Sequence, residues 1–314
     1  MGALPLRLGT RGSALAIAQA NLVAEAVGGG RIVEIRTSGD EEAHGDQGRA
    51  PEPQPGGDKA RFVREIERAL LAGEVDVGVH SAKDLPAELP EGLEIAGVPP
   101  REDALDAYVG EGTGLADLPE GARIGTSSLR RRAQLLALRP DVEIVPVRGN
   151  VDTRLRRLAG DDVDGLVLAA AGLRRLGREG EIGFRVEREQ MIPAPGQGAL
   201  ALEVRSDDAA AMTAAQVATD RGALAALTAE RAVVAELEAS CNTPVGAHAE
   251  ISAGRMRIAG FCGLPDGGEW IRDEVEADAS EPEPLGRELG ERMLAAGARD
   301  LLDRAERMVA GAAG

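Results

Sequence analysis

Short apolar runs alternate with segments of helical periodicity over the first two hundred residues, and this alternation constrains the fold more than any other feature. Strands are expected at Leu4–Leu8, Arg31–Thr37, Val75–Val79 and Leu93–Val98, with helices from Thr10 or Ser13 to Val27 and from Arg61 to Ala72. Strands that alternate with helices are typical of βαβ units. The sequence therefore predicts an α/β fold with parallel sheets.

The pattern starts again near residue 103, and the last ninety residues follow a different one. Further strands are expected at Val142–Val147, Gly165–Ala170 and Leu200–Val204, with helices at 129–138 and 152–158. A long Ala-rich helix ends near Leu237. The sequence then predicts a strand at Glu250–Ile258, a hairpin at Gly267-Gly268 and one helix from Pro284 to Val309. We expect a second α/β domain followed by a small α+β domain.

The charge of the chain is strongly negative but unevenly spread. A net charge of −17 argues against a nucleic-acid partner, because phosphate contacts need a basic face. Residues 121–160 nevertheless hold nine arginines and only three acidic residues. A site for an anionic ligand and a solvated helix face explain this arginine island equally well.

The composition also indicates the cellular setting. No apolar run approaches the ~20 residues that span a bilayer, and residues 1–9 lack the apolar core of a signal peptide. The two cysteines, Cys241 and Cys262, are too few for a disulfide framework. We expect a cytoplasmic protein with no membrane partner.

Three polar motifs follow expected strands at their carboxyl ends, where ligands of open α/β sheets bind. They are Gly9-Thr10-Arg11-Gly12-Ser13, Thr126-Ser127-Ser128-Leu129-Arg130-Arg131 and Arg148-Gly149-Asn150. Hydroxyl and N–H groups at a helix N-terminus bind anions, and arginines add bidentate donors. Simple N-capping explains each motif taken alone, but the three together favour a cleft that holds several carboxylates or phosphates.

Two other segments carry reactive groups. His80-Ser81-Ala82-Lys83-Asp84 follows an apolar strand and brings a base, a cation and a carboxylate to its end. Asp84 beside Lys83 should stay ionised, and it can stabilise a cation or move a proton; an ordinary salt bridge is the alternative. Cys241 lies in a polar loop and suits a nucleophile or an attachment point, whereas Cys262 lies in an expected strand. No cysteine or histidine spacing is typical of a zinc site, so no metal is expected.

Taken together and in this order, these motifs resemble the porphobilinogen deaminase (hydroxymethylbilane synthase) family. The matching stretches run from residue 9 to residue 246 and also include Phe62-Val63-Arg64-Glu65, Arg101-Glu102-Asp103 and Gly196-Gln197-Gly198-Ala199. Each stretch is weak alone, whereas the collinear set is specific.

The resemblance implies two periplasmic-binding-protein-like α/β domains flanking a cleft, plus a small α+β C-terminal domain. The implied bounds are 1–99 with 197–219, 100–196, and 220–314. The resemblance also implies a monomer and a dipyrromethane cofactor attached to Cys241 through a thioether. Four porphobilinogen molecules would be joined head to tail with loss of ammonia, and water would release hydroxymethylbilane.

The resemblance assigns roles to individual residues as well. Asp84 is the implied catalytic group, which would stabilise the cation left when ammonia departs. The residues implied to bind the cofactor, besides Cys241, are Lys83, Thr126, Ser127, Ser128, Arg130 and Arg131. Those implied to bind substrate are Arg11, Ser13, Lys59, Phe62, Arg148, Arg154 and Arg175, with Lys59 and the polar loop before it resembling the family's lid.

Two other functions share part of this pattern. A binding module of the periplasmic type would use the same cleft and arginines, but it would need neither Cys241 nor Asp84. A phosphate-handling transferase would use the helix starts, but the sequence has no P-loop and no clear cluster of magnesium-binding carboxylates. An intact mass separates the three, since only the deaminase would carry covalent pyrroles.

Overall fold

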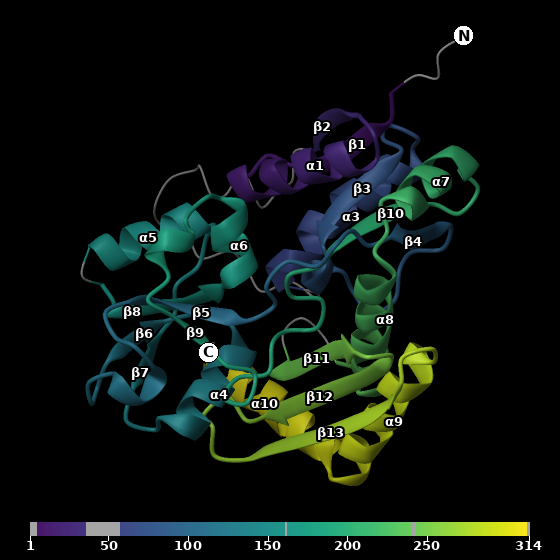
Figure 1. Cartoon of the computed structure of the whole chain (residues 1–314). Helices are drawn as coiled ribbons and strands as arrows, with labels where there is room; N and C mark the ends of the chain where they lie inside the picture. The colour runs from purple at the N-terminus through teal and green to yellow at the C-terminus, as the bar shows by residue number, and fades with distance from the viewer. Residues whose placement is uncertain (1–4, 36–56, 161, 240–242, 313–314) are drawn as a thin grey trace. The chain divides into compact units, whose positions relative to one another are not determined.

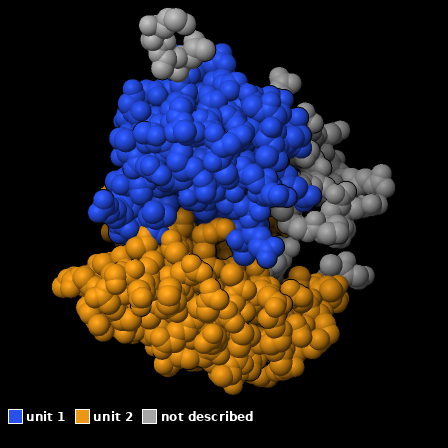
Figure 2. All heavy atoms as spheres, turned by 90° about the vertical axis from the view of Figure 1, so that its right-hand side faces the viewer, with its two compact units in different colours: residues 1–102, 199–224 blue, residues 103–198, 225–314 orange. Residues whose placement is uncertain are grey.

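The computed structural model describes residues 5–35, 57–160, 162–239 and 243–312, with side chains at 57–62 and 312 left aside (Figure 1). The chain forms two compact units, coloured separately in Figure 2. The first comprises Met1–Glu102 and Ala199–Leu224, and the second comprises Asp103–Gly198 and Ala225–Gly314. The expected division into three domains, with the first at 1–99 and 197–219, stays a prediction. The second unit contains the segments expected as the second and third domains, each with a sheet of its own.

The first unit is a five-stranded mixed sheet with helices on both faces. Its strands are β1 (Arg7–Arg11), β2 (Arg31–Ile35), β3 (Val77–Ser81), β4 (Leu93–Gly97) and β10 (Leu200–Arg205), in the order β2-β1-β3-β10-β4. Its helices are α1 (Ala14–Ala26), α3 (Gly57–Leu71) and α7 (Ala209–Val217), with the short 3-10 helix η1 (Ala82–Asp84) after β3. Apolar side chains of α1 and α7 pack on one face of the sheet, and those of α3 pack on the other.

Residues 103–198 of the second unit form another five-stranded mixed sheet. Its strands are β5 (Asp106–Gly110), β6 (Arg123–Gly125), β7 (Glu143–Val145), β8 (Gly165–Ala169) and β9 (Phe184–Val186), in the order β7-β6-β8-β5-β9. Its helices are α4 (Leu129–Leu138), α5 (Val151–Ala159) and α6 (Ala170–Arg175), with the short 3-10 helices η2 (Leu115–Asp117) and η3 (Glu179–Glu181). Leu135 of α4 belongs to the core on one face, and Leu155 of α5 and Leu173 of α6 belong to the core on the other.

Neither sheet is purely parallel, so that expectation was wrong. β1 pairs in parallel with β2 and β3, and β6 pairs in parallel with β7 and β8. In each sheet, however, one strand runs antiparallel to its neighbours: β10, which returns from a distant part of the chain, in the first, and β5 in the second. Two five-stranded mixed sheets, each with its antiparallel strand next to an edge strand, are the arrangement of a periplasmic-binding-protein-like fold.

The C-terminal part of the second unit is an antiparallel meander covered by helices. It consists of β11 (Val245–Ser252), β12 (Arg255–Gly263), β13 (Trp270–Asp278), α8 (Arg221–Glu236), α9 (Pro282–Ala295) and α10 (Ala298–Ala312). Two expectations fail here. The strand expected at 250–258 contains the turn Ala253-Gly254, where both residues have positive φ, and the single C-terminal helix is interrupted at Gly297, where φ is 100°. No helix in the described ranges is both long and apolar enough to cross a membrane.

Candidate functional site

In the first unit, the carboxyl ends of β1 and β3 lie at the same edge of the sheet because the two strands are parallel neighbours. β1 extends through Arg11, further than its apolar run suggests, because its backbone pairs with β2 as far as Arg11 opposite Ile35. Ser13 then caps α1, its hydroxyl accepting the Ala16 N–H at 3.3 Å. The alternative cap, Thr10, is buried within the strand. This edge therefore brings together the Arg11–Ser13 segment and the end of β3.

Lys83 and Asp84 lie on η1, directly after β3. The flanking residues Ala82 and Leu85 are buried, so that they anchor the turn, while Lys83 and Asp84 are only partly buried. The Ala82 N–H donates to the Ala199 carbonyl at 3.0 Å, and the Ser81 hydroxyl exchanges hydrogen bonds with the Gln19 amide at 3.0 and 3.3 Å. Lys83 and Asp84 are thus held on a short turn anchored to α1 and to the residue before β10.

His80 does not lie with Lys83 and Asp84, although the motif predicts a base at the same strand end. Its imidazole is buried on the face covered by α3, with Nε2 3.0 Å from Oε2 of the fully buried Glu203. Glu67 of α3 is buried as well, and its burial and the nearby Glu203 charge raise the pKa of its carboxyl group. Alternation along β3 turns His80 inward. Its partner on β10, Glu203, has no signal in the local sequence pattern.

In the second unit, Thr126-Ser127-Ser128 joins the end of β6 to the start of α4. The Ser128 hydroxyl accepts the Arg131 N–H at 3.4 Å, and the Thr126 hydroxyl accepts the Ser128 N–H at 3.2 Å. Ser127 between them is exposed. Capping therefore uses two of the three hydroxyls, while Ser127 stays accessible at the positive end of the helix dipole.

Arg130 and Arg131 turn inward from the first turn of α4 and meet Asp106 of β5. Arg130 Nη1 lies 2.7 Å from Asp106 Oδ2, and Arg131 Nε and Nη2 lie 2.9 and 2.8 Å from Oδ1. All three side chains are buried. Burial alone would raise the pKa of Asp106, but the charges of the two arginines more than offset it and hold that pKa far below its usual value.

The buried group of Asp106, Arg130 and Arg131 carries a net positive charge, because two guanidinium groups share one carboxylate. Arg130 Nε is also buried and has no hydrogen-bond acceptor in the described part of the chain. A further anion at this helix N-terminus would offset the excess positive charge and could accept a hydrogen bond from Arg130 Nε. The residues present therefore fit a ligand that carries carboxylates.

The other expected ligands of the second unit lie on neighbouring segments. Arg148 is exposed in the loop after β7. Asn150 caps α5 by accepting the Thr153 N–H at 2.9 Å, and Arg154 Nε donates to the Gly149 carbonyl at 2.9 Å. Arg175, at the end of α6, donates to the Gly198 carbonyl at 2.7 Å. The parallel strands β6 and β7 bring the Ser127 and Arg148 segments to one edge of the sheet.

Other arginines of the island pair with the protein's own acidic groups. Arg123 binds Asp164 at 2.7 Å, Arg139 binds Asp141 at 2.6 Å and Arg157 binds Asp162 at 2.8 Å. The two explanations of the island thus apply to different members: these three form surface ion pairs, whereas Arg130 and Arg131 form a buried cationic group.

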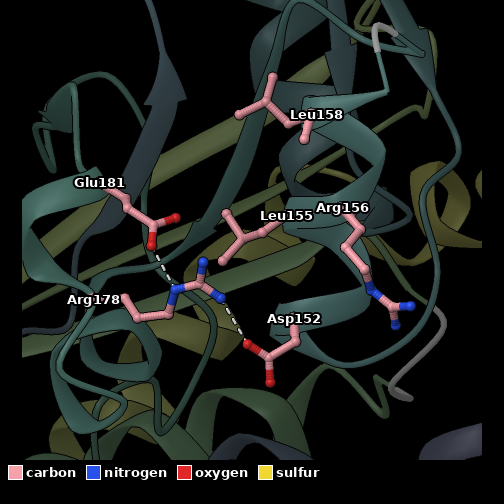
Figure 3. A pocket seen from close by; sticks show the side chains of 7 residues that line it. Asp152, Leu155, Arg156, Leu158, Arg178 and Glu181 are labelled. Atoms are coloured by element: carbon pink, nitrogen blue, oxygen red, sulfur yellow. Dashed lines mark hydrogen bonds and ion pairs between the residues drawn. The ribbon is translucent and has the colours of Figure 1, made fainter.

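A hollow of about 560 Å³ in the second unit does not coincide with the expected site. Its lining residues are Asp152, Leu155, Arg156, Leu158, Ala159, Arg178 and Glu181, none of which the sequence assigned to a ligand. Figure 3 shows Arg178 between Glu181 and Asp152, with an ion pair to each. These acidic groups already neutralise Arg178, so the hollow offers little to an anionic ligand.

Three expected site residues cannot be placed by their side chains. Cys241 lies outside the described residues, and Lys59 and Phe62 belong to the part of α3 in which only the backbone is described. Cys262 is fully buried in β12, and burial raises the pKa of its thiol to about 12. Cys262 is therefore a poor nucleophile. Among the described residues, no group of three acidic, histidine or cysteine side chains is arranged to hold a metal ion.

Comparison with known proteins identifies the family. Residues 6–213 match the family model "Porphobilinogen deaminase, dipyromethane cofactor binding domain", and residues 224–295 match "Porphobilinogen deaminase, C-terminal domain". The chain belongs to the porphobilinogen deaminase family. Porphobilinogen deaminase of Deinococcus deserti is 46% identical over 308 residues, covering 95% of this chain and 98% of the relative. That of Trichlorobacter lovleyi is 43% identical over 304 residues, covering 95% and 96%.

A solved periplasmic solute-binding protein of the TRAP type from Desulfovibrio salexigens is similar with 12% identity and a TM-score of 0.39, covering 69% of this chain and 73% of that one. Porphobilinogen deaminases are transferases that polymerise porphobilinogen stepwise in tetrapyrrole biosynthesis on a dipyrromethane cofactor. The predicted family, the stepwise polymerisation of porphobilinogen and the dipyrromethane cofactor are therefore confirmed, whereas the attachment of the cofactor to Cys241 stays a prediction.

Proposed function

We propose that this chain joins four porphobilinogen molecules head to tail and releases hydroxymethylbilane, using dipyrromethane attached to Cys241. The observation that carries the proposal is the buried, net-positive group of Arg130, Arg131 and Asp106 at the N-terminus of α4. Each pyrrole of substrate and cofactor carries an acetate and a propionate. A helix end with excess positive charge suits such ligands.

In this proposal the residues at the start of α4 hold the cofactor. Ser127 and Ser128 donate their hydroxyls, Thr126 supports the turn through Ser128, and Arg130 offers its Nε. Lys83 supplies a compact cation. When bound, the dipyrromethane supplies the electron-rich pyrrole carbon to which substrate units are added. Arg130 and Arg131 thus act chiefly by setting the charge of this region.

Asp84 stabilises positive charge and accepts a proton during the reaction. It faces the pyrrole N–H groups, stabilises the cation left on porphobilinogen when ammonia departs, and accepts the proton lost after the carbon–carbon bond forms. Its position on a turn anchored by buried Ala82 and Leu85 supports this role, because the carboxylate is held in place yet stays accessible. The reaction then needs only proton transfer and cation stabilisation from the chain.

Substrate carboxylates are bound by a second set of residues. These are Arg11, Ser13, Lys59, Phe62, Arg148, Arg154 and Arg175. Arg148 is exposed and Arg11, Arg154 and Arg175 are partly buried, so that their forks can reach a ligand. We further propose that the protein works as a cytoplasmic monomer on a free small molecule, without nucleic acid or membrane, in keeping with its net charge of −17.

Intact-mass spectrometry tests the proposal. Protein from a host with normal pyrrole supply should carry two covalent pyrrole units, and Cys241→Ser should have the bare polypeptide mass and no activity. Cys262→Ala is the matched control and should keep the adduct, because the Cys262 thiol is buried. An unmodified wild-type mass would contradict the proposal and favour a non-catalytic binding module.

A further inference from the structure

Residues 192–198, which precede β10, are held by several buried hydrogen bonds. Gly196 and Gly198 have φ of 71° and 83°, a conformation that favours glycine. Gln197 between them is completely buried, and its amide donates to the Ala104 carbonyl at 2.7 Å and to Asp106 Oδ1 at 2.9 Å. The Gln197 side chain therefore binds the same carboxylate as Arg130 and Arg131.

The same segment is also tied to α4 directly. Arg130 Nη1 donates to the Ile192 carbonyl at 2.7 Å. The Gln134 amide donates to that carbonyl at 3.0 Å and accepts the Ile192 N–H at 2.8 Å. Ile192 is consequently held directly by the first two turns of α4, whereas Gln197 reaches that helix only through Asp106.

A second buried carboxylate connects this segment to the C-terminal domain. Glu230 of α8 is fully buried; its Oε2 accepts the Gly196 N–H at 2.7 Å and its Oε1 accepts the Ala249 N–H of β11 at 2.8 Å. The Ala247 N–H adds a hydrogen bond to the Pro193 carbonyl at 3.1 Å. In the chain, α8 and β11 are the two elements on either side of Cys241.

We propose that Glu230, Gln197 and Asp106 are positioning residues that fix the cofactor-binding end of α4 relative to α8 and β11, the two elements that precede and follow Cys241 in the chain. The inference rests on the proposed function, because a fixed distance between α4 and the elements on either side of Cys241 matters only to a ligand that is attached at Cys241 and bound at α4. We call these contacts the buried bridge. It runs from Ala249 through Glu230, Gly196, Gln197 and Asp106 to Arg130 and Arg131.

The physical basis is preorganisation. A ligand tethered at one point and bound at another has the highest effective concentration when the two points keep a separation that the tether matches. Both carboxylates of the bridge are buried and accept hydrogen bonds from backbone or side-chain donors, which are strong in such surroundings. The bridge thus restricts the movement of the N-terminus of α4 relative to α8 and β11, between which the ligand would be attached.

The test measures how fast the full-length apo-protein acquires its covalent adduct. Apo-protein from a host that lacks porphobilinogen is mixed with porphobilinogen, and intact masses are recorded over time. Gln197→Met removes both amide donors, and Glu230→Gln keeps the side-chain shape but places an N–H donor against a backbone N–H. Each variant should load about tenfold more slowly than wild type, the effect of losing roughly one hydrogen bond between oriented groups.

Arg139→Met is the matched control. Arg139 lies at the opposite end of α4, where it donates to the Leu115 and Leu118 carbonyls and pairs with Asp141. Its loss should lower the melting temperature without slowing the loading. The holo-forms of the bridge variants should show a raised KM for porphobilinogen with a smaller change in kcat, which destabilisation alone would not produce.

The outcomes separate the inference from the function it rests on. Wild-type protein that never acquires an adduct would overturn both. If the wild-type protein acquires its adduct but the bridge variants load at the wild-type rate, or no more slowly than Arg139→Met, the positioning role of the bridge is overturned and the proposed function stands. Should Gln197→Met fail to fold, Glu230→Gln decides by the same criteria.

Discussion

Replacing Asp106 by asparagine should destabilise the second unit more than replacing either arginine that binds it. Asp106→Asn preserves the side-chain shape but leaves the guanidinium groups of Arg130 and Arg131 buried without a counter-charge. Removing one partner of a buried ion pair costs about 3–5 kcal/mol. Arg131→Met instead leaves the neutral pair of Arg130 and Asp106 at 2.7 Å.

The main loss in Arg131→Met is the donor to the Val167 carbonyl, which Arg131 Nη1 contacts at 2.8 Å. An unmet buried carbonyl costs about 1–3 kcal/mol. We therefore expect Asp106→Asn to lower the free energy of unfolding by about 2 kcal/mol more than Arg131→Met does. The assay is equilibrium urea unfolding at pH 7, followed by the fluorescence of Trp270, the single tryptophan, which lies in the second unit.

The pH dependence gives a second check. Since the folded-state pKa of Asp106 is depressed, its ionised form stabilises the fold above the unfolded-state pKa of about 3.9, and this stabilisation is lost as the pH falls toward the folded value. The difference between wild type and Asp106→Asn should be constant near neutrality and shrink below about pH 4. Asp106→Asn at least as stable as Arg131→Met at pH 7, or a difference that does not change on acidification, would refute the reasoning.

Three further predictions concern the site. Asp84→Asn should keep its covalent adduct but lose about 100-fold or more in turnover, as a carboxylate facing a developing cation would; near-normal turnover in a steady-state assay would exclude the catalytic role. Arg130→Leu should be isolated mainly as apo-protein, whereas Arg11→Leu should be isolated as holo-protein with impaired substrate binding, and equal holo fractions by mass spectrometry would contradict the two assignments. Cys262 should resist alkylation in the native protein at pH 8 and react after unfolding, because burial raises its thiol pKa to about 12; rapid native labelling at Cys262, located by peptide mapping, would show that the thiol is accessible.

Local signals in the sequence were enough to predict the helix starts. Ser13, Ser128 and Asn150 each cap a helix, and capping needs only a short polar side chain three residues before the N–H that it accepts. The residues around Cys262 likewise predict a strand interior from local sequence alone, and its position within β12 confirms this prediction.

Contacts distant in the sequence could not be predicted. Asp106 lies 25 residues from Arg131, in a five-residue strand with no alternating pattern to mark it, and Glu230 lies 34 residues from Gly196. The inward direction of Arg130 and Arg131 follows from that buried carboxylate. The antiparallel direction of β10 likewise depends on where the chain returns to the first sheet. Such features come from tertiary pairing, on which local periodicity carries no information.

The position of β10 in the first sheet also dictates an order of events during synthesis. β10 lies between β3 and β4, with Leu200 paired to Ser81, so the first sheet lacks an interior strand until residue 205 is available. At about 5–20 residues per second, the ribosome needs roughly 5–25 s to make the intervening chain. All five strands of the second sheet, by contrast, lie between Asp106 and Val186. The second sheet should therefore be completed before the first. In ribosome-arrested chains of residues 1–190, followed by a C-terminal linker long enough to span the exit tunnel, β6 and β8 should be protected from hydrogen exchange while β3 and β4 still exchange.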